Sequence, residues 1–169
     1  MPTARALAHK RLAWALVGSL VAASLLIPSG LTDASANAPK YRYRASEKCF
    51  MRKVNQSRAA NGQRRLNWDK QLGYVARRHA RTLARQGGVW HDQNLGRRVT
   101  RWRSLGQNTG AGGRCRNLYK SFMASAPHRA NILGRWRFIG VGTQWRNHRL
   151  YVQTIFESKR NPGNVWSWP

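Results

Sequence analysis

The most regular pattern of apolar residues lies in the middle of the chain, between Asp69 and Gly88. Apolar residues recur there at three- and four-residue spacing, which predicts an amphipathic helix with arginines mostly on its other faces. Asp69 is the expected N-cap, and the Gly87-Gly88 pair is the expected end. His79 falls on the apolar stripe, so we interpret it as a hydrogen-bonded core histidine. The stripe comprises Leu72, Val75, Ala76, His79, Ala80 and Leu83.

An earlier helix is predicted upstream of this one. Ser46 is placed to cap it, and Glu47 lies beside its positive end. The Asn61-Gly62 pair is a helix-stop signal. Phe50, Met51 and Val54 are the residues expected to face the core.

The region after the central helix is less regular. Residues 89–117 show no clear period, so we expect irregular structure with a short helix near Val99–Leu105. A helix is then expected over Asn117–Ala124. Another follows in "SAPHRANIL", with Ser125 as its cap and Gly134 as its end.

The last part of the chain changes to a strand pattern. The runs "FIGVGTQW" and "LYVQTIF" are rich in β-branched and aromatic residues, and "RNHR" between them is a plausible turn. These runs predict a β-hairpin after the helices, and therefore an α+β fold in one domain.

The first 38 residues have the composition of a secretory signal. Basic residues precede an apolar run from Leu12 to Ile27, and A-x-A cleavage sites end at Ala36 and Ala38. An uncleaved membrane anchor is the alternative, but the run is shorter than the roughly 20 residues that span a bilayer. We therefore expect residues 1–38 to be removed.

The expected mature chain then has three parts. Residues 39–45 form a basic leader, residues 46–158 form the domain, and residues 159–169 form a C-terminal tail. Trp166 and Trp168 of the tail are placed to fold back on the sheet.

The charge of the chain indicates its binding partners more directly than any motif does. The chain has 31 Lys and Arg residues against 5 Asp and Glu, a formal net charge of +26. With so few carboxylates, most arginines have no internal salt-bridge partner, and the surface attracts polyanions. Basic residues mixed with Trp90, Trp102 and Trp136 suit phosphate pairing and stacking on bases or sugars. The expected polyanion-binding residues are Arg97, Arg98, Arg101, Arg103, Arg114 and Arg116.

Two cysteines, Cys49 and Cys115, are present in the chain. An even count in an exported protein predicts one disulfide. In the chain-entropy model, a bridge closing so long a loop is worth roughly 4 kcal/mol.

Five motifs in this order and spacing resemble the CAP superfamily of cysteine-rich secretory, antigen 5 and pathogenesis-related 1 proteins, in its bacterial secreted branch. They are "VNQSRAANGQRRLNWDKQLGYVARRHA", "VWHDQNL", "LGQNTG", "SAPHRANILGRWRFIGVG" and "YVQTIF", which together span about residues 46–157. The resemblance implies a CAP-like α-β-α sandwich, with a small antiparallel sheet between helices, and a cavity lined by histidines and glutamates.

Carried over residue by residue, the resemblance places His91, Gln107 and His128 in that cavity, with Asn108 beside them. Gln107 matches a family glutamate, and an amide is no general base and a poor metal ligand. Any metal, such as a weakly held zinc, would rest on His91 and His128, whereas zinc hydrolysis needs three protein ligands. Asp92 either orients His91 or caps the next turn.

We interpret the chain as a secreted or cell-envelope-associated, monomeric, non-catalytic binding module for anionic envelope or extracellular polymers, nucleic acid included. Its His/Gln cavity would be vestigial or hold a small polar ligand. A metal-assisted hydrolase using His91 and His128, supported by Asp92 or Glu157, is the alternative. Lipid or sterol binding is a further one. A serine–histidine nucleophile at Ser125 and His128 is less favoured, because within one helical turn the hydroxyl more naturally caps backbone N–H groups.

Overall fold

The computed structural model describes residues 41–159. Five helices and four strands follow one another along this part of the chain. In order they are α1 (Ala45–Ala60), β1 (Asn67–Trp68), α2 (Lys70–Gln86), α3 (Leu95–Arg98), β2 (Leu105–Gly112), α4 (Cys115–Ala124), α5 (Ala126–Leu133), β3 (Phe138–Arg146) and β4 (Arg149–Glu157).

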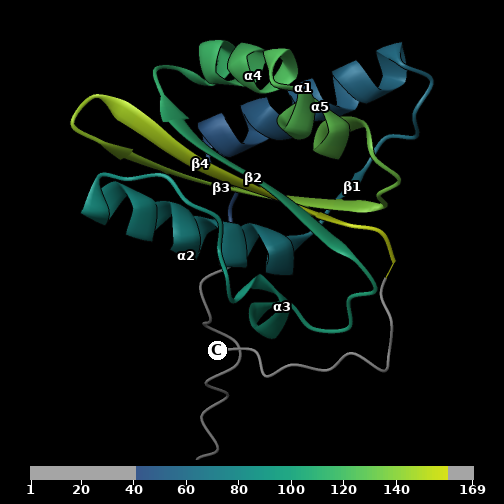
Figure 1. Ribbon diagram of the computed structural model, residues 1–169, viewed down its shortest axis with the longest axis horizontal. Coiled ribbons are helices and arrows are strands. Elements are labelled where there is room, and N and C mark those ends of the chain that lie inside the picture. Colours follow the sequence, from purple (N-terminus) through teal and green to yellow (C-terminus); the bar gives the residue numbers. More distant parts are fainter. Residues whose placement is uncertain (1–40, 160–169) are drawn as a thin grey trace, which may run out of the picture. The chain divides into compact units, whose positions relative to one another are not determined.

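The strands form one sheet in the order β1-β3-β4-β2. β3, β4 and β2 are antiparallel neighbours, and β1 adds a two-residue parallel pairing beside the start of β3. Helices α1, α4 and α5 cover one face of the sheet, and α2 with α3 lies on the other (Figure 1). The predicted α+β sandwich is confirmed, and the only departure from an antiparallel sheet in the described residues is the short parallel β1.

Alternation along β3 explains how α2 packs. Ile139 and Val141 point into the core beneath α1, whereas Gly140 and Gly142 face α2. A Cβ on Gly142 would lie 1.9 Å from the Arg77 backbone nitrogen, and one on Gly140 would lie 2.2 Å from the Gly73 nitrogen. The helix therefore rests directly on the sheet backbone, which only glycine permits.

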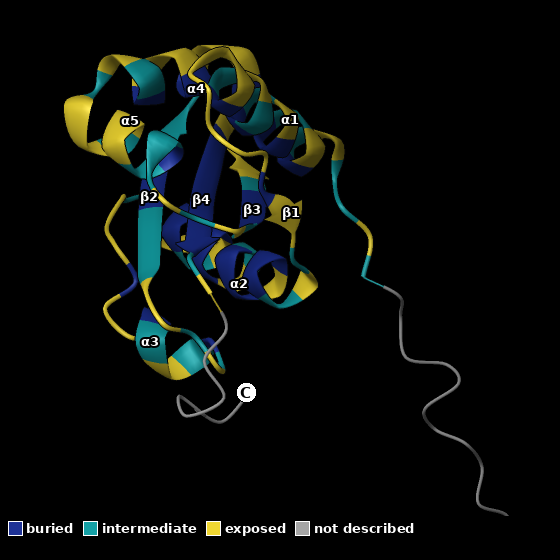
Figure 2. Ribbon diagram, turned by 90° about the vertical axis from the view of Figure 1, so that its right-hand side faces the viewer, coloured by how far each residue is buried: buried dark blue, intermediate teal, exposed yellow. Residues whose placement is uncertain are grey.

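The other face carries the larger core. Phe50, Met51 and Val54 of α1 are buried, as the helical spacing predicts, and they cluster with residues of α4, α5, β3 and β4. Cys49 and Cys115 form the predicted disulfide, with Cα atoms 6.4 Å apart, and it joins α1 to the first residue of α4. Figure 2 shows the buried central strands β3 and β4 between the partly exposed helices, with β2 less buried and β1 exposed.

The start of α1 differs from the prediction. The helix begins at Ala45 with Arg44 at the N-cap position, and the Glu47 side chain accepts a hydrogen bond from the Arg44 backbone N–H at 2.8 Å. Ser46 is no cap, because its hydroxyl is used in a 2.7 Å hydrogen bond with the Thr143 hydroxyl of β3. The Ser46 hydroxyl thus bonds to a residue far away in the sequence and not to the backbone of its own helix.

The glycine-rich stretch is the largest error of the pattern analysis. Residues 105–112 were expected to be irregular, but they form β2, which pairs with β4 along its whole length. The glycines make room for aromatic rings, since a Cβ on Gly110 would lie 2.6 Å from Phe122 and one on Gly106 would lie 2.8 Å from Trp136. The short helix, α3, precedes this strand instead of lying near Val99–Leu105.

The remaining helix and hairpin predictions hold within a few residues. Asp69 caps α2, accepting a hydrogen bond from the Leu72 backbone N–H at 2.9 Å, and Gly87 ends it with a φ of 72°. The predicted hairpin is β3 and β4. Within residues 41–159, none of the helices combines the length and apolar character that a membrane crossing needs.

The terminal predictions stay predictions. The signal at residues 1–38 and Trp166 and Trp168 of the tail lie outside the described residues. Residues 41–44 of the predicted leader contact the domain, where the Arg77 guanidinium lies over the Tyr41 ring.

Gly142→Ala is expected to destabilise the protein by at least about 3 kcal/mol, because overpacking against backbone atoms leaves no side chain that can yield. The free energy of unfolding from denaturant titration measures the loss. Gly113→Ala is the matched control, since a Cβ there meets nothing within 4 Å. A loss in Gly142→Ala no larger than in the control would contradict the close packing of α2 on β3.

Candidate functional site

The four residues predicted to share a cavity do line one pocket. It has a volume of about 400 Å³ and lies at β2, which is an edge strand of the sheet. His128 comes from α5, His91 from the segment after α2, and Gln107 and Asn108 from β2 itself. The complete lining is Val89, Trp90, His91, Gln107, Asn108, Thr109, Pro127, His128 and Asn131.

The Gln107 side chain is held by three hydrogen bonds. Its Oε1 accepts from the Asp92 backbone N–H at 2.9 Å and from Gln153 Nε2 at 2.8 Å, and its Nε2 donates to the Asp92 carbonyl at 3.1 Å. Both halves of the amide are therefore in use. A carboxylate at this position would meet the Asp92 carbonyl with a second acceptor, so these contacts favour the amide.

His128 is fixed on three sides. Its Nδ1 lies 2.8 Å from the Ser125 hydroxyl, its ring stacks on Phe122 at 4.7 Å between centroids, and its backbone carbonyl accepts from Asn108 Nδ2 at 2.9 Å. The prediction for Ser125 was wrong. It occupies the N-cap position of α5, but its hydroxyl makes no capping hydrogen bond and contacts the imidazole instead.

The pKa of His128 is lowered. Burial of the imidazole is the main cause and the neighbouring His91 adds to it, whereas a hydrogen bond with the Thr109 backbone opposes the shift. The neutral imidazole is thus favoured in the folded protein.

His91 is exposed, and Asp92 does not orient it. The Asp92 carboxylate accepts from the Asn94 backbone N–H at 3.0 Å and pairs with Arg98 at 2.9 Å. Of its two predicted roles, Asp92 therefore has the second, which is to cap the turn that follows it. Neither Asp92 nor Glu157 lines the histidine pocket in the part of the chain described.

These residues fit a metal poorly. Among residues 41–159, no three His, Cys, Asp or Glu side chains come together as a ligand set. His91 and His128 supply two nitrogens, and Gln107 already spends its oxygen on two hydrogen bonds. His79, as predicted, is a core residue, whose Nε2 lies 2.8 Å from the Trp90 carbonyl oxygen.

One pocket residue was missed by the sequence analysis. Asn131 donates to the Gln107 carbonyl at 3.1 Å and to Asn108 Oδ1 at 2.8 Å. It lies three residues after His128 on α5, a spacing that puts both on one helix face. The three-residue spacing from His128 is the sequence feature from which Asn131 could have been predicted.

The six predicted polyanion-binding arginines do not form one surface. Arg97, Arg98, Arg101 and Arg103 lie in or after α3, whereas Arg114 and Arg116 lie at the start of α4. β2 runs between the two groups, and an eight-residue strand is roughly 25 Å long. Figure 1 shows α3 and α4 well separated.

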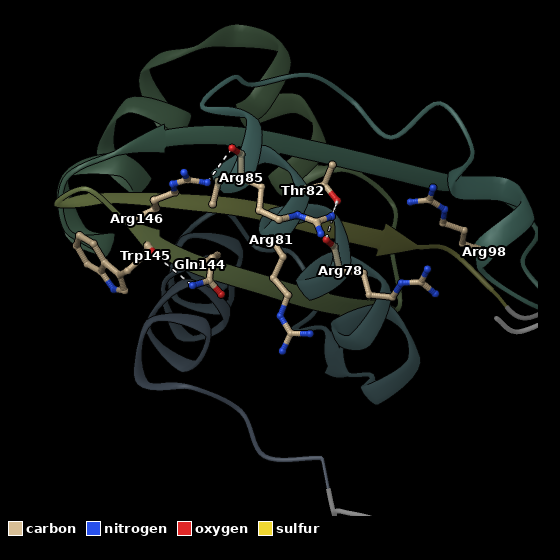
Figure 3. A pocket seen from close by; sticks show the side chains of 9 residues that line it. Arg78, Arg81, Thr82, Arg85, Arg98, Gln144, Trp145 and Arg146 are labelled. Atoms are coloured by element: carbon tan, nitrogen blue, oxygen red, sulfur yellow. Dashed lines mark hydrogen bonds between the residues drawn. The ribbon is translucent and has the colours of Figure 1, made fainter.

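A different arginine cluster was not predicted as a group. It lines a groove of about 430 Å³ along α2 and the end of β3 (Figure 3). Arg98 is the one residue that belongs both to this cluster and to the six predicted polyanion-binding arginines. The sequence carried a partial signal, because Arg78, Arg81 and Arg85 follow helical spacing, but Arg146 comes from the distant hairpin.

Comparisons with known proteins support the architecture. The model of the CAP family, the cysteine-rich secretory protein family, matches residues 51–156. Among curated proteins, none matches this chain.

Three solved structures illustrate the similarity. An outer surface protein of Borrelia burgdorferi is 15% identical with a TM-score of 0.62, covering 68% of this chain and 92% of its own. An extracellular protein of Bacillus anthracis with an SCP domain is 20% identical with a TM-score of 0.59, covering 68% of this chain and 40% of its own. A cysteine-rich secretory protein of Staphylococcus aureus is 23% identical with a TM-score of 0.51, covering 70% and 42%. This chain therefore spans less than half of the latter two proteins, and identities this low show the fold alone.

Gln107→Glu is expected to cost about 1–3 kcal/mol of stability at pH 7, because the new carboxylate faces the Asp92 carbonyl without a proton to donate. Denaturant titration at pH 7 and pH 4 measures it. Part of the loss should be recovered at pH 4, where protonation restores a donor. Gln93→Glu, an exposed change in the same region, is the control. A Gln107→Glu protein as stable as the control would contradict the bonded amide.

Stability is also expected to fall as the pH drops. The pKa of His128 is lower in the folded protein than its ordinary value of about 6.5, so the unfolded chain binds the proton more readily. The stabilisation is therefore present above pH 6.5 and is lost as the pH falls through the folded-state pKa. The free energy of unfolding should decrease less between pH 7 and pH 5 in His128→Gln than in the wild type. His148→Gln, an exposed change in the hairpin turn, should keep the wild-type dependence, and the same dependence in His128→Gln would count against the shift.

Proposed function

The chain belongs to the CAP family of cysteine-rich secretory proteins, and within it we propose a non-catalytic binding module for anionic envelope or extracellular polymers. The site of action would be outside the cell or at its envelope. Support for that location comes from relatives, since the Bacillus anthracis protein is extracellular and the Borrelia burgdorferi protein is an outer surface protein. Removal of residues 1–38 as a signal is part of the same proposal.

The charge of the surface carries the proposal. The described residues include four acidic side chains, Glu47, Asp69, Asp92 and Glu157, against a large excess of arginine. Two of the four are paired with arginines, since Glu47 pairs with Arg77 and Asp92 with Arg98. Most other arginines of this part are exposed. A positive field of this size is neutralised best by a polyanion, and counterion release then drives binding.

The pocket favours binding over chemistry. Its amide, Gln107, is bonded by both its oxygen and its nitrogen, and its histidines lack a carboxylate partner among the residues that line it in the described chain. A metal hydrolase needs three protein ligands, and the two histidines alone do not supply them. The pocket of His91, Gln107, Asn108 and His128 is therefore proposed to hold a small polar ligand or to be vestigial.

Binding to isolated cell envelopes should weaken at least about tenfold between 50 and 200 mM salt, because each released counterion adds to the salt dependence. Sedimentation of the purified protein with envelopes across a salt series measures this. The double variant His91→Ala/His128→Ala should bind as the wild type does.

Two results would contradict the proposal. Salt-resistant binding that fails in the double variant would place the function in the histidine pocket. Absence of binding at every salt concentration would exclude the envelope as the target.

A further inference from the structure

The arginine groove on α2 has the form of a ligand site. Arg78, Arg81 and Arg85 line it from α2, Arg98 lies at one end, and Arg146 with Trp145 lies at the other (Figure 3). In the part of the chain described, no carboxylate is among its lining residues. Arg98 is compensated by Asp92, which leaves a row of four arginines without an acidic neighbour in the groove.

Helix geometry places three of these arginines in a row. Arg78, Arg81 and Arg85 are spaced by three and four residues, so they lie on one face of α2 over about 10 Å of its axis. Arg146 extends the row past the end of the helix, since its Nη1 donates to the Arg85 carbonyl at 2.8 Å. Like charges at these spacings repel each other, so the row does not stabilise the helix.

The guanidinium groups keep most of their donors for a ligand. Arg85 uses one in a 3.3 Å hydrogen bond to the Thr82 hydroxyl, and Arg146 uses one on the Arg85 carbonyl. A guanidinium has five N–H donors in a planar fork that matches two oxygens of one phosphate. The row therefore offers several phosphate-binding forks in succession.

Trp145 supplies a second kind of contact. Trp145 is a large apolar residue that is nevertheless 47% exposed, and it lines the end of the groove next to Arg146. Side chains alternate along β3, so its ring points away from the Arg146 guanidinium and lies beyond the end of the arginine row (Figure 3). A basic track that leads to an exposed aromatic ring is a combination that binds single-stranded nucleic acid, with phosphates on the cations and a base stacked on the ring. A duplex would hide its base faces, and a phosphate polymer without bases would leave the indole unused.

We propose that this groove binds single-stranded nucleic acid, with successive phosphates on Arg78, Arg81, Arg85 and Arg146 and one base stacked on Trp145. The inference rests on the proposed function, because it names the polymer and the surface that takes it. It also moves the site away from the arginines that flank β2.

Fluorescence anisotropy of a labelled oligothymidylate, titrated with the full-length protein over a salt series, tests the groove. Arg81→Gln/Arg85→Gln should weaken binding at least tenfold and reduce the salt slope by roughly 1.4, at about 0.7 for each lost phosphate contact of a single strand. The control is Arg114→Gln/Arg116→Gln, which removes the same charge at the start of α4 and should stay within about twofold of the wild type. Equal losses in the two variants would overturn the groove as the site.

Trp145→Ala tests the identity of the polymer. It should weaken oligothymidylate binding about tenfold, the order expected for one stacked base, and leave binding of inorganic polyphosphate unchanged. Oligothymidylate binding that ignores Trp145→Ala would overturn the nucleic acid assignment, as would polyphosphate binding the wild type as tightly as the oligonucleotide.

The experiments distinguish failure of this inference from failure of the proposed function. Salt-sensitive binding to envelopes without any binding of oligothymidylate would overturn this inference and leave the proposed function standing. Loss of both would overturn both.

Discussion

The buried carboxylate of Glu47 is the interaction on which the arrangement of α1, α2 and β3 depends. It is fully buried and accepts hydrogen bonds from the Arg77 guanidinium at 2.8 and 2.5 Å, from the Arg44 backbone and from the Thr143 backbone at 3.3 Å. A buried charge costs several kcal/mol unless it is paired and hydrogen-bonded. These partners come from both faces of the sheet, so satisfying one carboxylate fixes two helices and a strand together.

At both edges of the sheet, side chains bond to strand backbone. β1 pairs with only the first two residues of β3, and beyond it the segment around Arg44 and Glu47 bonds to the backbone of Thr143. At the opposite edge, Asn131 bonds to the backbone carbonyl of Gln107 in β2. Covering an exposed edge prevents pairing with another chain. The histidine pocket is thus built from groups that also protect an edge strand.

Local patterns predicted what local physics determines. The apolar stripe and Asp69 cap of α2, the hairpin and the cysteine pair needed only spacing and residue type. β2 was missed because its three glycines have low strand propensity. Two of them, Gly106 and Gly110, make room for the rings of Trp136 and Phe122, which come later in the chain. Ser46 and Ser125 were wrongly assigned as helix caps. The hydroxyl of each bonds to another side chain instead, Thr143 for Ser46 and His128 for Ser125. The resemblance to a known family identified the pocket. The arginine groove was not predicted, because it joins α2 to a hairpin about 60 residues away.

The partners of Glu47 also set an order on folding. Arg77 lies 30 residues after it and Thr143 lies 96 residues after it. Closing loops of that length costs chain entropy before any contact forms, so such topologies fold slowly. α1 is synthesised first among the helices of the described chain, but its carboxylate stays hydrated until the C-terminal hairpin arrives. A chain that emerges from a ribosome or a membrane pore N-terminus first therefore has to be almost completely delivered before its first helix can settle.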